Sequence, residues 1–299
     1  MAKSTVTSIG PALNTEIIDA LILGYARESA FLAPFFRQKN IYGSGSLKAD
    51  FNSFGALAAA ATTPGTDLTP TEHTVGEDGT VTASEKGVAV EPSMTALEQG
   101  GANGYTEDAV AREVGAAVAE KLQVDIATAF ASLTNSTGTS GADMTIADFE
   151  DALYALRSRK VPISAPPDFN LPAAWSRVLC VLAEIQALDF FRAIRQNGDT
   201  LAKVSISLDG LGSAAMGAIR GEFMGVPIIA TANNTTANAS ADVVGFMGVP
   251  AALGITQAAP PQILMADWVL GRSKHVVGRA VYGVGVIKDA FGQKIVTDA

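Results

Sequence analysis

Apolar residues recur with a helical period in the middle of the chain. One set of positions is spaced by four residues, with a last member three further on: Val110, Val114, Val118, Leu122, Ile126, Phe130 and Leu133. This spacing puts the side chains on one face of a helix. Thr106 is suited to cap that helix, and Glu107 and Asp108 suit its positive N-terminal end. The pattern predicts a helix over 107–133, about 40 Å long at about 1.5 Å per residue.

Three other segments have helical patterns. Residues 14–25 begin with a capping Asn14 and carry apolar residues on one broad face, and Pro34 would end or bend that helix. Thr145 and Asp148 approximate a capping box, which predicts a helix that ends near the basic stretch 157–160. Residues 172–195 show apolar spacings of three and four and also predict a helix.

Extended structure is expected on both sides of the helical middle. Residues 41–92 are rich in Gly, Ser and Thr, with turn signals at 64–65 and 78–79, and predict hairpin-like arms rather than a packed core. A region with so few large apolar side chains cannot fold by itself. It is therefore expected to be disordered or to lie along a neighbouring chain. The apolar segment 31–36 would need the same cover. From Gly221 the pattern changes to strands, expected at these positions: 226–231, 243–247, 268–270, 276–277 and 282–287. This mixed order is typical of the α+β class.

Composition points to a surface that is covered by other chains. The 299 residues include 17% charged and 48% hydrophobic residues, with a mean hydropathy of +0.25; an average soluble protein has about 25% charged residues. No apolar run reaches the roughly 18 residues that a bilayer span needs, and residues 1–7 lack the apolar stretch of a secretory signal. The net charge of −9 and the absence of a basic run argue against a reader of nucleic acid.

The residues that could carry chemistry are few and scattered. His73 and His275 lie far apart without other metal ligands near them in the sequence, and Cys180 sits in an apolar run where a small buried side chain is expected. Residues 210–215 fit a relaxed dinucleotide-binding fingerprint but lack the acid expected about 20 residues later. We favour a flexible glycine-rich connection there over an enzyme's cofactor site. The sequence therefore predicts a non-enzyme with no catalytic residue, no cofactor and no metal.

The order of these segments resembles that of a known family. An arm, a Gly/Thr-rich extended region, a long helix, a helical middle and C-terminal strands follow one another, with three sequence pieces at 87–93, 221–229 (GEFMGVPII) and 281–286 (VYGVGV). In this order the chain resembles the major capsid proteins of tailed bacteriophages with the Hong Kong-type fold. The resemblance covers nearly the whole chain.

The resemblance implies a division of the chain into four parts. Residues 1–40 would form an N-terminal arm and 41–92 an extended loop that lies over a neighbouring subunit. A peripheral domain built on the long helix would combine 93–145 with 258–299. Residues 146–257 would form an axial domain around the centre of pentamers and hexamers.

The same resemblance implies a function and partners. It implies a structural subunit that self-assembles into pentamers and hexamers of an icosahedral head around double-stranded DNA, located in the virion and assembled in the host cytoplasm. Expected partners are other copies of the chain, a separate scaffolding protein, a portal, a decoration or cement protein, and DNA touched weakly and non-specifically, with no membrane. The alternative is the shell of a bacterial encapsulin-like nanocompartment.

The family's type member cross-links a loop lysine to an asparagine near its C-terminal region. This chain offers Lys48 and Lys86 in the loop, but no asparagine follows Asn238. We therefore expect a shell that is held together without covalent bonds.

Overall fold

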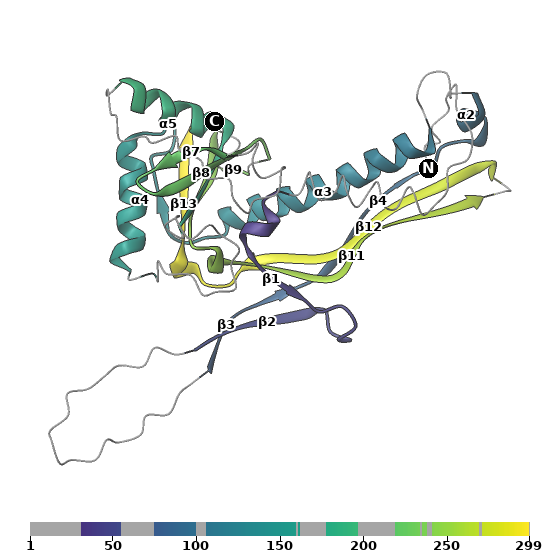
Figure 1. Cartoon of the computed structure of the whole chain (residues 1–299), viewed down its shortest axis with the longest axis horizontal. Helices are drawn as coiled ribbons and strands as arrows, with labels where there is room; N and C mark the ends of the chain where they lie inside the picture. Colours follow the sequence, from purple (N-terminus) through teal and green to yellow (C-terminus); the bar gives the residue numbers. More distant parts are fainter. Residues whose placement is uncertain are drawn as a thin grey trace, which may run out of the picture.

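The molecule is elongated, with a globular part at one end and a long sheet backed by a helix at the other (Figure 1). The computed structural model describes residues 31–54, 75–99, 106–159, 161, 178–196, 219–233, 235–237, 241–268 and 271–298. The predicted helix at 14–25 and the fingerprint at 210–215 lie outside these residues. A two-stranded hairpin projects away from the middle of the long axis (Figure 1).

The long helix α3 (Glu107–Ala131) joins the two ends of the molecule. Its N-cap is Thr106, whose side-chain oxygen accepts a hydrogen bond from the Ala109 amide at 3.2 Å. The predicted apolar face is buried, from Val110 at 2% exposed to Phe130 at 0%, except that Leu122 is only partly buried. Both the cap and the face of this helix are therefore confirmed, and the last turn ends two residues earlier than expected.

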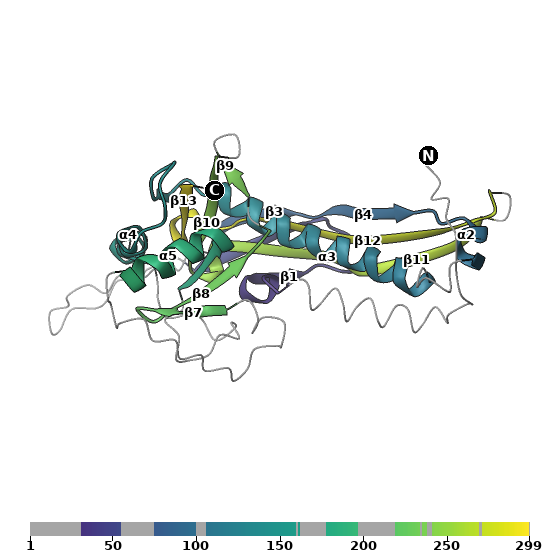
Figure 2. The ribbon, with the colours of Figure 1, turned by 90° about the horizontal axis from the view of Figure 1, so that it is seen from above.

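A four-stranded sheet extends along α3 in the order β1–β11–β12–β4. Its centre is a long antiparallel hairpin of β11 (Leu253–Trp268) and β12 (Ser273–Val286), flanked by β4 (Ser84–Val90) and by β1 (Arg37–Asn40), which runs parallel to β11. The α3 side chains pack on one face of this sheet. Figure 2 shows the helix running along the strands. The sequence predicted separate short strands here, because interspersed glycines and prolines interrupt the apolar pattern while the backbone ladder continues through bulges.

A seven-stranded sheet forms the globular part. Six strands follow in the order β5–β13–β10–β6–β8–β7, and β9 also pairs with β10. Their bounds are β5 (Ser136–Thr137), β6 (Leu179–Ala183), β7 (Ile219–Phe223), β8 (Val226–Thr231), β9 (Thr236–Ala237), β10 (Asp242–Gly248) and β13 (Gly292–Asp298). The predicted strands at 226–231 and 243–247 are confirmed as β8 and β10. Because β13 lies between β5 and β10, distant parts of the sequence complete one sheet.

Strand β6 corrects the helix that was expected over 172–195. Residues 172–177 lie outside the described part of the chain; of the rest, 184–196 is helical, as α5 (Glu184–Gln196), whereas 179–183 forms β6, in which every residue is buried. Leu179 and Val181 belong to the core on one face of the sheet, and Cys180 and Leu182 to the core on the other. A strand buried on both faces reads as a continuous apolar run, so its period cannot be distinguished from that of a buried helix.

Two helices cover one face of the globular sheet. In α4 (Ile146–Ser158) the predicted capping box is present between Thr145 and Asp148, and α5 packs beside it through stacked rings of Phe149 and Phe190 with centroids 5.1 Å apart. The remaining helical elements are short: η1 (Ala33–Phe35), α2 (Met94–Gln99), η4 (Pro250–Ala252) and η6 (Asp289–Phe291).

The large side chains of the apolar segment 31–36 are mostly buried inside their own chain, which corrects the expectation that a neighbouring chain is needed to cover them. Leu32, Phe35 and Phe36 are 0–2% exposed. The Phe36 ring contacts those of Phe130 and Phe246, with centroids 5.8 and 5.6 Å away. These partners come from α3 and β10, so no local pattern near residue 36 could have identified them.

The described parts of the region 41–92, residues 41–54 and 75–92, are mostly extended, as predicted, but some of these residues belong to the core of their own chain. β2 (Lys48–Phe54) pairs with β3 (Val75–Thr82) as a hairpin, and β4 joins the long sheet. Phe51 and Val81, at 1% and 3% exposed, pack against Ile287. The base of the projecting hairpin is therefore anchored on the body of its own chain.

Candidate assembly surfaces

The residues singled out for chemistry do not come together in the described part of the chain. Cys180 is fully buried, and this burial raises the pKa of its thiol, so the reactive thiolate is disfavoured at neutral pH. His275 packs beside Trp268 with ring centroids 5.3 Å apart. His73 lies outside the described residues. Among those described, no group of three His, Cys, Asp or Glu side chains is placed to hold a metal ion.

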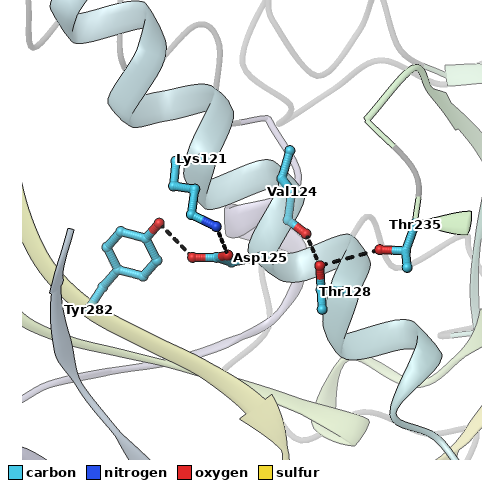
Figure 3. A network of polar contacts seen from close by, with 6 residues as sticks. All are labelled: Lys121, Val124, Asp125, Thr128, Thr235 and Tyr282. Carbon is cyan, nitrogen blue, oxygen red and sulfur yellow. Dashed lines mark hydrogen bonds and ion pairs between the residues drawn. The ribbon is translucent and has the colours of Figure 1, made fainter. Parts of the chain in front are cut away.

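A polar network joins α3 to β12 (Figure 3). The Tyr282 hydroxyl donates to Asp125 at 2.9 Å, and the Lys121 ammonium bonds the other oxygen of the same carboxylate at 2.6 Å. Burial, followed by the charge and hydrogen bond of Asp125, raises the pKa of Tyr282 above its usual value. The phenol therefore stays protonated and serves as a structural donor.

A second polar contact holds the other end of α3. The Lys274 ammonium at the far end of β12 bonds Glu107, in the first turn of the helix, and also lies 3.6 Å from Asp267. The hydrogen bond that Lys274 donates to Glu107 is the main cause that raises the pKa of Lys274. Because both ends of α3 are tied to the same strand, helix and sheet form one stiff unit.

A cavity of about 150 Å³ lies between α3 and the long sheet. Its walls are mostly apolar, including Val118, Leu122 and Ile255, with Tyr282 beside them. Lys39 also lines it, but the lysine ammonium already donates to the Asp50 carbonyl at 2.7 Å. This lining offers packing surface and no arrangement of nucleophile, base and oxyanion donor.

The base of the β2–β3 hairpin packs directly against the backbone of two glycines. A Cβ at Gly283 would overlap the carbonyl oxygen of Thr82, and one at Gly254 would overlap the side chains of Ile287 and Phe51. The hairpin base therefore approaches β11 and β12 more closely than any side chain would allow. This close approach fixes the direction in which the hairpin leaves the body.

In the described part of the chain, most of the large apolar side chains that remain exposed gather at three places, and Met224 lies apart from them in the turn between β7 and β8. Tyr42 and Leu47, at 68% and 56% exposed, flank the turn before the hairpin. Leu264 and Trp268 lie near the far end of β11. The third group lies on the two helices of the globular part: Tyr154, Ile185 and Leu188. These side chains, and not the segment 31–36, are the apolar surface that the described chain offers to a partner.

No family model and no curated protein sequence matches the chain, whereas solved structures do. The capsid of Ralstonia phage GP4 matches over 100% of this chain and 95% of its own, with a TM-score of 0.67 and 11% identity. The head of Helicobacter pylori bacteriophage KHP40 gives a TM-score of 0.63 at 10% identity, covering 100% and 95%. The chain has a phage capsid fold.

The likeness to capsid structures covers nearly the whole length of the chain. The capsid of cyanophage P-SCSP1u covers 99% of this chain and 92% of its own, with a TM-score of 0.61 and 14% identity. A virus-like particle from Pyrococcus furiosus matches less well, with a TM-score of 0.51 at 13% identity over 94% and 98%. The Hong Kong-type fold expected from the order of segments is thereby confirmed.

None of the described helices is both long and apolar enough to span a membrane.

Proposed function

We propose that this chain is the major capsid protein of a tailed bacteriophage, a structural subunit and not an enzyme. One observation carries the proposal: phage capsid structures match the fold over 99–100% of the chain. A projecting hairpin and exposed apolar side chains at three separate places support it, because an assembling subunit must touch several neighbours at once. Copies would form pentamers and hexamers of an icosahedral head around double-stranded DNA, in the virion and, before that, in the host cytoplasm.

The parts of the chain would take the roles that the capsid fold gives them. The β2–β3 hairpin with the residues between its strands would be the extended loop, and α3 with β4, β11 and β12 the peripheral domain. The seven-stranded sheet with α4 and α5 would be the axial domain. Since β13 and β5 pair within that sheet, we assign 292–298 and 136–137 to the axial domain, whereas the sequence alone assigned them to the peripheral domain.

The partners proposed are further copies of the chain, a scaffolding protein, a portal and a decoration or cement protein. The net charge of −9 suits a container whose DNA must enter and leave without adhering to the wall. We also propose that the shell is non-covalent. Mature particles should dissociate fully into monomers on a denaturing gel, and a ladder of cross-linked species would contradict this.

The test is electron microscopy with sedimentation of the purified protein, expressed alone and then with a candidate scaffolding protein. Closed icosahedral particles, or separate pentamers and hexamers, are the expected result. A stable monomer or dimer in both preparations would contradict the proposal.

A nanocompartment shell is the second candidate, favoured by the likeness to the Pyrococcus furiosus virus-like particle. The contents of particles purified from their natural source decide between the two. Nuclease-protected double-stranded DNA supports the phage head, and an enclosed enzyme supports the compartment.

A further inference from the structure

The exposed faces of α4 and α5 carry complementary chemistry. On α4, Glu150, Asp151, Tyr154 and Arg157 lie on one face at helical spacing, and all four are exposed. On α5, the exposed side carries Glu184, Ile185, Leu188, Arg192 and Arg195. The face of α4 thus presents two acids, an aromatic ring and then a cation, and the face of α5 presents an acid, two apolar side chains and then two cations.

The two faces do not satisfy one another within one subunit. The contacts that join α4 to α5 are made by their buried sides, where Phe149 stacks on Phe190. Arg192 pairs with Asp189 of its own helix at 3.1 Å, with 59% of the arginine side chain still exposed. Tyr154 is 72% exposed and Leu188 47%. In protein interfaces, apolar side chains such as these act as anchors, and charged side chains around them form the rim.

The order of charges along each helix fits an antiparallel pairing. From N- to C-terminus, α4 presents acids, Tyr154 and then Arg157, whereas α5 presents Glu184, Leu188 and then cations. Glu150 and Tyr154 are four residues apart, as are Leu188 and Arg192, and each step is about 6 Å along a helix axis. With the helices antiparallel, Tyr154 meets Leu188 while the acids meet the arginines.

We propose that α4 of one subunit binds α5 of the next, in a head-to-tail contact between copies of this chain. The helices lie on two adjoining sides of one corner of the globular part (Figure 1), and head-to-tail contacts between two different faces of one subunit are what generate a closed ring. This inference rests on the proposed function and specifies which surfaces close the pentamers and hexamers. The acid–arginine pairs select the partner face, and Tyr154 with Leu188 supplies the apolar contact.

Charge reversal tests this contact. One variant carries Glu150→Lys with Asp151→Lys, a second carries Arg192→Glu with Arg195→Glu, and a third carries all four changes. Each double reversal should lower the yield of closed particles by about tenfold or more, because like charges then meet across the contact. The fourfold variant restores unlike pairs in the opposite sense and should recover most of the wild-type yield.

A matched control separates this contact from a general effect of charge. Glu113→Lys with Glu120→Lys makes the same change at two exposed positions of α3 and should leave the yield within about twofold of wild type. Urea unfolding of unassembled subunits shows whether each variant still folds. Double reversals that assemble like wild type, or a fourfold variant no better than its parents, would overturn the inference while the proposed function stands. A wild-type chain that forms no capsomer would instead contradict the proposed function.

Discussion

At the scale of single residues, the positions that matter most are those where a small or polar side chain permits a long-range contact. Because Gly283 and Gly254 have no side chain, the base of the β2–β3 hairpin can pack directly against the backbone of β11 and β12. Tyr282 joins the same strand to α3 through Asp125. All three lie in the long hairpin of β11 and β12, so that hairpin places both the helix and the projecting arm.

Replacing Gly283 by alanine should destabilise the subunit by about 1–3 kcal/mol, because the new methyl group meets the rigid Thr82 carbonyl. Urea unfolding of the unassembled protein measures this. Gly285→Ala is the matched control, since its nearest contact is the end of the Val81 side chain at 3.3 Å, which can move. Equal effects of the two substitutions would show that the close backbone approach does not hold the hairpin.

Tyr282→Phe should cost about 1 kcal/mol at neutral pH by removing the hydrogen bond to Asp125. The folded state raises the pKa of this phenol, so its stabilising contribution is complete below pH about 10 and is lost as pH rises further. The difference in unfolding free energy between wild type and variant should therefore shrink in alkali. A difference that stays constant to pH about 12 would contradict this link.

At the scale of elements, the sequence predicted the helices whose caps and apolar faces are encoded within a few neighbouring residues. Helices α3 and α4 carry their caps and apolar faces within a few residues, at Thr106 and at the Thr145–Asp148 box, and both were predicted. Strand β6 was not, because burial on both faces removes the alternation that identifies a strand. The helical faces now proposed as an interface were also missed, since which side of α5 is exposed depends on the sheet beneath it.

The burial of the segment 31–36 inside its own chain, and not against a neighbour, can be tested by substitution. Phe36→Ala should destabilise the folded subunit by about 3–5 kcal/mol, since the ring is buried against Phe130 and Phe246. Leu264→Ala, at a side chain that is 50% exposed, should change the free energy of unfolding by less than about 1 kcal/mol. A Phe36→Ala subunit of normal stability that failed only in assembly would restore the interface role predicted from sequence.

At the scale of the whole molecule, the capsid fold joins a stiff body to a projecting arm. The sequence predicted an arm over 41–92, but β4 and the anchoring residues Phe51 and Val81 belong to the body. The order of segments was enough to indicate the fold, whereas the boundary between arm and body depends on contacts with Ile287 and β12, far away in sequence.

Deleting 55–74 separates the arm from the body more cleanly than deleting 41–92. Phe54 and Val75 are paired across the hairpin, so a two-residue Asn-Gly turn can replace the segment between them. The shortened chain should fold with near-wild-type stability and form no closed shells by electron microscopy. Shells of normal size from this variant would show that the tip of the arm is not needed for closure.

The place of β13 in its sheet has a consequence for synthesis on the ribosome. This strand follows all its sheet partners in the sequence, yet it pairs with β10 in the interior of the sheet, and Ile295 lies in the core beneath α4 and α5. A nascent chain cannot complete that core until residues 292–298 have emerged. Chains terminated before residue 292 would therefore lack Ile295 and the last strand beneath α4 and α5, and the surface of these two helices would lose part of its support.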